Sequence, residues 1–403
     1  MTKKAHVRPH DIRGYSRLAI DATLGLTRLV ETMHHNIART PTPLGASTRE
    51  PTKGITGLVY RTIQGTTRLV GGGIDALLAQ LLPLLDREPA ATSGPREAVL
   101  AALNGVLGDH LAASNNPLAI PMQLRRAGQP LIMRSPDLAA SIPAARGKIL
   151  LLVHGLCMND LQWRRKGHDH GEALAATGGF TPIYLHYNSG EHISTNGHAL
   201  AELLETLVRV WPVPVEHLVI LGHSMGGLVA RSACHYGGLA QHGWLKHLRR
   251  LVFLGTPHHG APLERGGNWV NLILELSPYT AALAGLAKIR SAGITDLRHG
   301  SVVDDDWQRG DRFAHNRKPH FVPLPAMVPC YAVAVTIAKA ADGQSESLLG
   351  DGLVPLSSAL GRHAEKSRCL EFAEGNQWIG HGMNHLDLLD RNEVFDQLRR
   401  WLG

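Results

Sequence analysis

The stretch Leu218-Val219-Ile220-Leu221-Gly222-His223-Ser224-Met225-Gly226 joins a short apolar, strand-like run to a G-x-S-x-G motif. Residues 228–234, which follow it, read as a helix. Where a strand turns this sharply into a helix, the central serine is left exposed at the end of the strand, and glycines flank it because the neighbouring backbone leaves no room for side chains. The pattern therefore predicts Ser224 as a catalytic nucleophile, and a serine in an ordinary glycine-rich turn is the simpler alternative.

A serine hydroxyl becomes an effective nucleophile only when a histidine takes its proton and an acid orients that histidine. Where the serine sits on a strand-turn-helix, the acid and then the histidine follow it along the chain. Of the 24 histidines, His385 fits best, because it lies after the strand-like residues 369–372 and before a terminal helix predicted over residues 392–402. His381 is the nearby alternative, although a glycine and an unpatterned loop follow it.

The best candidate for the acid is Asp351, in the stretch Gly350-Asp351-Gly352. A glycine on each side allows a tight turn that can aim the carboxylate inward from the end of a strand. The alternatives in the same interval are Asp342 and the run Asp304-Asp305-Asp306. Three adjacent carboxylates are more typical of a solvated loop than of one buried acid. The sequence thus predicts a triad of Ser224, Asp351 and His385.

Acyl transfer also needs backbone N–H groups that bind the carbonyl oxygen as it gains negative charge, the oxyanion hole. We expect one from Met225, the residue after the nucleophile. We expect the other from Leu156, because the apolar run 148–153 leads into His154-Gly155-Leu156-Cys157, where a loop would follow an early strand. His154 is expected to shape this loop through hydrogen bonds and not to act as a second base.

Residues 148–403 resemble the serine lipase and esterase branch of the α/β-hydrolases. The pieces that carry the resemblance are His154-Gly155, Gly222 to Gly226, Leu254-Gly255-Thr256-Pro257-His258-His259-Gly260, the Asp351 turn and His385-Leu386-Asp387-Leu388-Leu389. They are similar to those of bacterial triacylglycerol lipases and of the GPI-inositol deacylase-like group, in which G-T-P-H-x-G follows the serine motif. The resemblance implies hydrolysis of carboxylic esters with a lipid-like acyl or alcohol part.

The order of apolar runs predicts the fold. Strands are expected at residues 148–153, 181–187, 218–221, 250–255, 328–335 and 367–372. Helical or loop stretches separate them, which favours a mainly parallel sheet flanked by helices. With the resemblance, this predicts an α/β-hydrolase domain over residues 147–403. Residues 261–326 interrupt the alternation with apolar, helix-compatible segments, so we expect a cap or lid insertion there.

Residues 1–146 carry the whole net charge of +7 and show helical apolar faces, so they are predicted to form a basic helical N-terminal extension. We expect it to pack on the hydrolase domain, and peripheral contact with a membrane surface is the alternative. Nucleic-acid binding is not expected, because the basic residues are dispersed and aromatic residues are scarce. The chain shows neither an apolar run of membrane-spanning length nor a signal peptide, so a cytoplasmic location is expected, with membrane association if the extension binds lipid.

We expect no cofactor and no metal. His168-Asp169-His170 and His258-His259 lack the spacing and the further partners of a metal site. The four cysteines do not form close pairs, so buried free thiols are expected. The expected substrate is a small hydrophobic ester. The alternatives are acyl transfer to another acceptor or amide cleavage by the same triad, and a non-catalytic protein that binds lipid surfaces.

Overall fold

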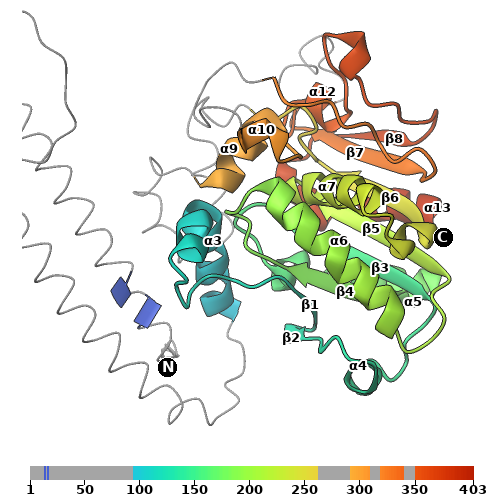
Figure 1. The fold of residues 1–403 in the computed structure, drawn as a ribbon. Coiled ribbons are helices and arrows are strands. Elements are labelled where there is room, and N and C mark those ends of the chain that lie inside the picture. The colour runs from blue at the N-terminus through green and yellow to red at the C-terminus, as the bar shows by residue number, and fades with distance from the viewer. Residues whose placement is uncertain (1–12, 15, 18–93, 262–290, 309–317, 340–349) are drawn as a thin grey trace, which may run out of the picture. The chain divides into compact units, whose positions relative to one another are not determined.

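An eight-stranded, mainly parallel sheet lies at the centre of the part of the chain that the structure describes (Figure 1). The strand order is β2-β1-β4-β3-β5-β6-β7-β8. The strands are β1 (Gln123–Arg126), β2 (Gln129–Pro130), β3 (Lys148–Val153), β4 (Thr181–His186), β5 (His217–His223), β6 (Leu248–Leu254), β7 (Cys330–Thr336) and β8 (Gln377–His381). All pairings between β4 and β8 are parallel, whereas β1 pairs antiparallel with β2 and β4. The predicted mainly parallel sheet is therefore confirmed.

The computed structural model describes residues 13–14, 16–17, 94–261, 291–308, 318–339 and 350–403. The chain separates into two compact units, Met1–Ser93 with Ala113–Ala119 and Gly94–Ala112 with Ile120–Gly403. In the first unit, the Arg17 guanidinium donates to the backbone carbonyls of Ser114 (2.9 Å) and Asn115 (3.1 Å). The helical faces expected around residues 18–33 and 74–85 lie outside the described residues, so the helical extension stays a prediction.

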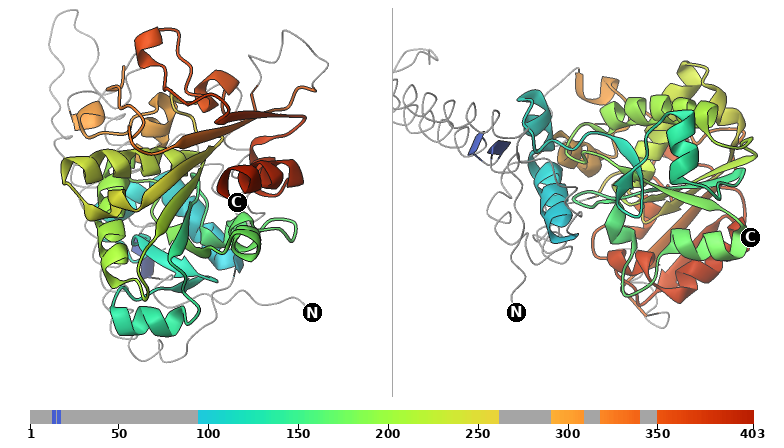
Figure 2. Two further views of the ribbon diagram at one scale, coloured as in Figure 1. Left: turned by 90° about the vertical axis from the view of Figure 1, so that its right-hand side faces the viewer. Right: turned by 90° about the horizontal axis from the view of Figure 1, so that it is seen from below.

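Helices cover both faces of the sheet (Figure 2). The helices of the described residues are α3 (Gly94–Ala113), α4 (Ser135–Ser141), α5 (His170–Gly178), α6 (Ile193–Val210), α7 (Met225–Leu239), α9 (Ala292–His299), α10 (Asp305–Gln308), α12 (Leu356–Ala359) and α13 (Asn392–Leu402). α6 and α7 pack together on one face, and α5 and α13 pack together on the other.

The pattern of burial explains the sequences of these elements. Residues 149–153 of β3 are fully buried, because parallel strands covered by helices on both faces have no solvent side. α13 buries a single stripe, in which Val394, Leu398 and Leu402 recur every four residues and join the same apolar cluster as Val333 of β7. The parallel strands end at one edge of the sheet, where the loops after β3, β5 and β7 meet.

The sequence predicted that the hydrolase domain starts at residue 147. The first strand of the sheet, β1, lies before that residue. Leu124 of β1 pairs with Leu185 of β4, and α3 belongs to the same compact unit as the sheet. β1 has the sequence Gln-Leu-Arg-Arg, which is too short and too polar to show a strand pattern. β1 lies beside the two-residue edge strand β2, and only its two middle residues are buried, so it needs no continuous apolar run.

The strand predicted over residues 367–372 is wrong. Lys366–Arg368 forms a 3₁₀ turn, and the last strand is β8, Gln377–His381. The apolar side chains of residues 370 and 372 pack elsewhere: Phe372 contacts the Phe253 ring edge-on, and Leu370 lies against Gly361. β8 lies at the edge of the sheet and is half-buried, so its sequence has no apolar run that marks it.

The predicted cap, residues 261–326, is described only in part. Its described portion includes α9 and α10, which contact the start of α6: His192 hydrogen-bonds to Asp296 (2.9 Å) and its ring stacks on Trp307. Residues 262–290 and 309–317 of this insertion lie outside the described residues. The expectation that this insertion covers an active site stays a prediction.

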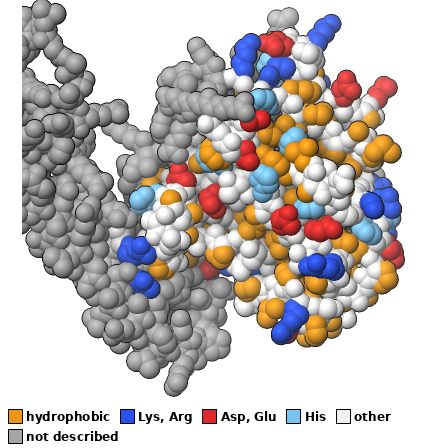
Figure 3. All heavy atoms as spheres, viewed as in Figure 1, with side chains coloured by type: hydrophobic (Ala, Val, Ile, Leu, Met, Phe, Trp, Pro, Cys, Tyr) orange, Lys and Arg blue, Asp and Glu red, His pale blue; other side chains and the backbone are white. Residues whose placement is uncertain are grey.

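The surface of the described residues fits the charge count. On the face seen in Figure 3, acidic and basic side chains are scattered among apolar and uncharged ones. This mixture agrees with the balanced charge of residues 147–403. Within the described ranges, no helix is both long enough and apolar enough to cross a bilayer.

Candidate active site

The serine motif forms the predicted turn between β5 and α7. Ser224 has φ 53° and ψ −124°, a backbone conformation that non-glycine residues rarely adopt. Glycines surround it for steric reasons: a Cβ on Gly226 would lie 2.2 Å from the Val153 carbonyl oxygen, and a Cβ on Gly222 would lie 2.6 Å from the Gly227 Cα. The predicted strand-turn-helix is confirmed, and it places Ser224 at the carboxyl end of the sheet.

Asp351 and His385 form a buried pair. The His385 Nδ1–H donates to the Asp351 Oδ2 at 2.6 Å, and the two side chains are only 1% and 3% exposed. The backbone N–H groups of Leu353 (2.9 Å) and Val354 (2.8 Å) donate to the Asp351 Oδ1. With both oxygens occupied, the carboxylate is held in one orientation, and it leaves the His385 Nε2 free to accept a proton.

The Asp351 turn depends on its two glycines. Gly350 has φ 47° and Gly352 has φ 93°, both in the region that favours glycine. A Cβ on Gly350 would also lie 2.0 Å from the Val354 carbonyl oxygen. The backbone N–H of His385 donates to the Asp351 carbonyl (3.1 Å), so the turn and the histidine loop are joined twice.

The loop that carries His385 packs onto the elbow. A Cβ on Gly255, which follows β6, would lie 3.1 Å from the His385 Cε1. The Ser224 N–H donates to the Leu254 carbonyl at 2.8 Å, so the elbow is attached to the end of the same strand. The His223 Nε2–H donates to the His385 carbonyl (3.3 Å), and the two rings lie 4.8 Å apart. Three distant segments therefore bring the loop of the predicted base against the turn that carries the predicted nucleophile.

The alternative acids serve other parts of the fold. Asp306 accepts hydrogen bonds from the backbone N–H groups of Val302 (2.9 Å), Val303 (3.2 Å) and His320 (2.7 Å). Asp306 is buried, so the acidic run is not the solvated loop that its composition suggested. Asp304 pairs with His198 of α6 at 3.1 Å. Asp342 lies outside the described residues, and His381 ends the edge strand β8.

The loop after β3 lies directly against the elbow. A Cβ on Gly155 would lie 3.0 Å from the Ser224 Cβ, which places the backbone of Leu156 next to the nucleophile. His154 is fully buried, its Nδ1–H donates to the Gly155 carbonyl (2.9 Å), and its ring stacks on Tyr187. Burial lowers the pKa of His154 to about 3, so its ring is neutral. These contacts fit the expected loop-shaping role.

α3 is a wall of this site that sequence reasoning missed, because residues 94–113 were assigned to the N-terminal extension. Its Gly105 lies against Cys157 in the loop after β3, and its Gly108 lies against Asn188 in the loop after β4. The Asn188 Nδ2–H donates to the Gly108 carbonyl at 2.9 Å. Two glycines three residues apart in an apolar helix were the available signal, since they mark one face that can approach other backbone closely.

A buried ionic cluster beside the same loop was also missed. The Arg125 guanidinium lies 2.8 Å from a Glu97 oxygen and 3.3 Å from an Asp160 oxygen. His186, at the end of β4, lies 3.2 Å from Asp160. Asp160 opens the 3₁₀ turn that ends the loop after β3, so the cluster anchors the far end of that loop. Any two of its four residues are separated by 26 to 89 positions in the sequence, so no short motif reveals the cluster.

The histidine pair His168 and His170, which drew attention in the sequence, has structural partners. His168 hydrogen-bonds to His170 (2.8 Å), and His170 to the Leu388 carbonyl (2.9 Å). Asp169 caps α5 through the backbone N–H of Gly171. Within the described residues, no three His, Cys, Asp or Glu side chains are placed to hold a metal ion. All four cysteines are free thiols, and Cys369 alone of them is partly exposed.

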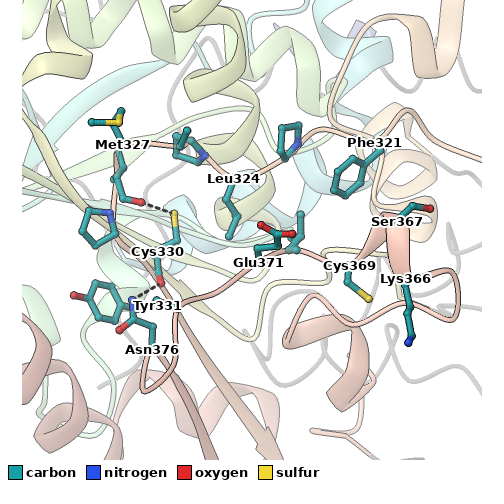
Figure 4. Close-up of a pocket in the computed structure, with 17 residues that line it drawn as sticks. Phe321, Leu324, Met327, Cys330, Tyr331, Lys366, Ser367, Cys369, Glu371 and Asn376 are labelled. Carbon is teal, nitrogen blue, oxygen red and sulfur yellow. Dashed lines mark hydrogen bonds between the residues drawn. The ribbon is translucent and has the colours of Figure 1, made fainter.

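A large pocket lies away from this site (Figure 4). It has a volume of about 1010 Å³ and is lined by residues 321–331 and by residues between 366 and 376. These include Cys330 and Tyr331, where β7 begins, whereas Ser224 lies where β5 ends. Since parallel strands begin at the edge opposite to the one where they end, this pocket cannot hold a substrate of Ser224.

Comparisons with known proteins agree with this architecture. Residues 144–328 match the family model of the PGAP1-like alpha/beta domain. No curated protein matches the chain. The matched residues run from β3 through β6 and contain the elbow, while Asp351 and His385 lie beyond them.

Solved structures with a similar arrangement include several lipases and esterases. Lipase BlEst2 of Bacillus licheniformis, in its mature form, has a TM-score of 0.39 and 16% identity over 70% of this chain and 98% of that chain. Lipase B of Aspergillus fumigatus has a TM-score of 0.38 and 12% identity over 62% and 52%. A lipase-esterase related protein of Clostridium acetobutylicum has a TM-score of 0.35 and 14% identity over 63% and 94%. At these TM-scores, the structural similarities do not indicate which substrate this protein uses.

The strand order, the elbow between β5 and α7 and the family match together define an α/β-hydrolase fold. More narrowly, residues 144–328 are similar to the PGAP1-like alpha/beta domain. The resemblance and the fold class predicted from the sequence are thereby confirmed.

Proposed function

We propose that this protein hydrolyses carboxylic esters through an acyl-enzyme formed on Ser224. The observation that carries the proposal is the buried Asp351–His385 pair, packed against a strained elbow that presents the serine. Strain of this kind persists only where the surrounding structure maintains it, and it is typical of functional sites. A serine in an ordinary turn has no need of such a conformation or of an oriented histidine beside it.

The reaction follows from the orientation of His385. Its Nδ1–H is held by Asp351, so its Nε2 takes the proton from the Ser224 hydroxyl as the oxygen attacks the ester carbonyl. The backbone N–H groups of Met225 and Leu156 bind the oxygen that gains negative charge. His385 then gives the proton to the leaving alcohol. In the second half it takes a proton from the water that attacks the acyl carbonyl, and it returns this proton to the Ser224 oxygen as the acid leaves. Asp351 stabilises the imidazolium in both halves.

The proposed substrate is a small ester with a hydrophobic acyl or alcohol part, as the resemblance to lipases implies. Acyl transfer to another acceptor and amide cleavage use the same residues and are the alternatives. The test is a series of p-nitrophenyl esters from acetyl to palmitoyl, with a p-nitroanilide of the best acyl group and added alcohols as acceptors. We expect a burst of nitrophenol, faster turnover of the ester than of the anilide, and release of free acid as the main product.

Ser224→Ala protein is the control for background hydrolysis. A product made mainly of the new ester, at low concentrations of added alcohol, would instead identify an acyltransferase. An anilide cleaved as fast as the ester would identify an amidase. An enzyme that turns over none of these compounds, and whose Ser224 does not react with a fluorophosphonate, contradicts the proposal.

We expect Asp351→Asn to lower kcat by roughly 10²- to 10⁴-fold, somewhat less than loss of the serine. The backbone N–H groups of Leu353 and Val354 will hold the new amide oxygen, which turns the amide NH₂ towards the His385 Nδ1. The histidine must then carry its proton on Nε2 and cannot act as a base. Steady-state kinetics at several pH values check this, and full activity of a folded Asp351→Asn protein would move the acid elsewhere.

Peripheral membrane contact through residues 1–146 is a further part of the proposal. Its support is the charge of +7 on those residues, which would be attracted to anionic lipid. A purely lipid-binding, non-catalytic role is less well supported, because the chain has a candidate for every member of the triad.

A further inference from the structure

The loop that carries the proposed oxyanion donor holds a strained residue. Cys157, immediately after Leu156, has φ 60°, in the left-handed region that costs a non-glycine residue about 1 kcal/mol or more. Cys157 is also buried, 1% exposed, and burial raises the pKa of its thiol to about 12. A neutral, inaccessible thiol is not a second nucleophile, so its conformation needs another explanation.

Two neighbours hold Cys157 in this conformation. Its backbone N–H donates to the Ser189 hydroxyl at 3.1 Å, and its Sγ lies 3.9 Å from the Ala102 carbonyl of α3. α3 approaches so closely that a Cβ on Gly105 would lie 2.2 Å from the Cys157 Sγ and 3.0 Å from both its Cα and its N. The fit of helix against loop therefore depends on the absence of a side chain at residue 105.

α3 is itself attached to the rest of the site. The Ser291 hydroxyl donates to the Gly105 carbonyl at 2.7 Å, and the backbone N–H of Ala292 donates to Asp109 at 3.0 Å. With the Asn188 contact to Gly108, the helix is joined to the loop after β4 and to the segment that enters α9. The helix is thus a fixed support against which the loop after β3 is placed.

Leu156 lies between two residues that cannot move freely. Gly155 on one side packs against Ser224, and Cys157 on the other is held by α3 and Ser189. We propose that Gly105 and Ser189 are positioning residues that aim the Leu156 N–H at the oxyanion, acting through the strained Cys157. The inference rests on the proposed ester hydrolysis, and neither residue touches the substrate.

The test compares an ester with the matching thionoester, in which sulfur replaces the carbonyl oxygen. Sulfur accepts hydrogen bonds weakly, so an enzyme whose N–H donors are well aimed prefers the oxygen compound, and one whose donors are displaced loses that preference. Loss of one oxyanion donor lowers kcat by roughly 10²- to 10³-fold. We expect Gly105→Ala and Ser189→Ala each to lower kcat for the ester about tenfold or more, with KM little changed and the oxygen-to-sulfur preference reduced by a similar factor.

A compensating change separates geometry from stability. Cys157→Gly removes the Sγ that an alanine at residue 105 would meet, and glycine adopts φ 60° without strain. We expect Gly105→Ala with Cys157→Gly to regain most of the oxygen-to-sulfur preference that Gly105→Ala loses. The matched control is Gly171→Ala in α5, whose Cβ would lie 2.6 Å from the Tyr184 hydroxyl and does not meet Cys157. It should lower the melting temperature and leave the preference unchanged.

Reaction with a fluorophosphonate counts the molecules in which Ser224 is active, so rates are compared per active site. If Gly105→Ala and Ser189→Ala lower the rates on ester and thionoester equally, the two residues are structural and the inference is overturned. If Gly105→Ala does not fold, Ser189→Ala alone decides. Failure of the proposed function has a different signature, because the unmodified protein would then neither turn over the ester nor react with the fluorophosphonate.

Discussion

Replacing Ser224 by alanine is expected to lower kcat on the best p-nitrophenyl ester by about 10⁴-fold or more, while the protein stays folded. The hydroxyl is the atom that attacks the carbonyl, and no other described nucleophile lies on the elbow. Alanine removes one oxygen from a side chain that is 7% exposed, and the strained backbone is already set by its neighbours. Steady-state kinetics and circular dichroism of the variant check both parts.

His385→Ala is expected to be similarly damaging, because the serine and the histidine act as one unit. The double variant should therefore be no worse than either single one. His381→Ala is the matched control, since this histidine lies nearby at the end of β8 and was the alternative base. Retained activity in a folded Ser224→Ala protein would reject the triad, and loss of activity in His381→Ala alone would transfer the role of base to that residue.

Acid is expected to lower the stability of this protein as the pH falls below about 6.5. Burial lowers the pKa of His154 to about 3 and that of His170 to about 4, and it holds the pKa values of His223 and His258 well below 6.5. In the unfolded chain each of these side chains takes up a proton near pH 6.5, whereas in the folded protein each stays neutral. The unfolded state thus binds more protons, and the free energy of unfolding falls as the pH drops.

For each such histidine, the free energy of unfolding is expected to fall by about 1.4 kcal/mol per pH unit. This holds between the pKa of the histidine in the unfolded chain and its pKa in the folded protein. His154 and His170 together would remove roughly 3 kcal/mol of an ordinary folding free energy of about 5 to 15 kcal/mol between pH 6.5 and pH 5, and His223 and His258 act in the same direction. Burial acts in the opposite direction on Asp296, whose pKa is raised, so that this carboxyl offsets part of the loss at lower pH.

Denaturant unfolding followed by tryptophan fluorescence at pH 7, 6 and 5 measures this dependence. His170→Gln should reduce the slope of the free energy of unfolding against pH by about the contribution of one proton, because glutamine does not titrate. His170 is fully buried and is not a member of the proposed triad, so its loss tests stability without removing the proposed base. A free energy of unfolding that stays constant between pH 6.5 and pH 5 would show that these histidines do not stay neutral when folded.

Much of the elbow and of the acid turn could be read from the sequence because their geometry is local. A sharp turn into a helix needs glycines at residues 222 and 226, and a turn that aims one carboxylate inward needs the two positive φ angles of Gly350 and Gly352. These requirements act within a few residues of chain, so they appear as short motifs. The same holds for β3 and α13, whose boundaries are predicted by runs and stripes of apolar residues.

Other elements depend on partners that are distant in sequence. β8 is recognisable as a strand only because β7 lies beside it, since its own residues are half-buried and mixed in polarity. The apolar residues near 370 resemble a strand in isolation but pack under a loop instead. The apolar residues thus indicated correctly that this segment is buried, but they did not indicate a strand. Apolar side chains can be buried against other side chains as well as within a sheet.

The sequence by itself determined the class of fold and the strand-turn-helix around the serine, and it predicted the acid and histidine that follow, because each is encoded in backbone requirements of a few adjacent residues. Only the tertiary structure decided that α3 belongs beside the site, that Glu97, Arg125, Asp160 and His186 form one buried cluster, and that Cys157 is held in a strained conformation. Those features are contacts between segments tens of residues apart, and their stability comes from excluded space and buried charge that exist only after the chain has folded.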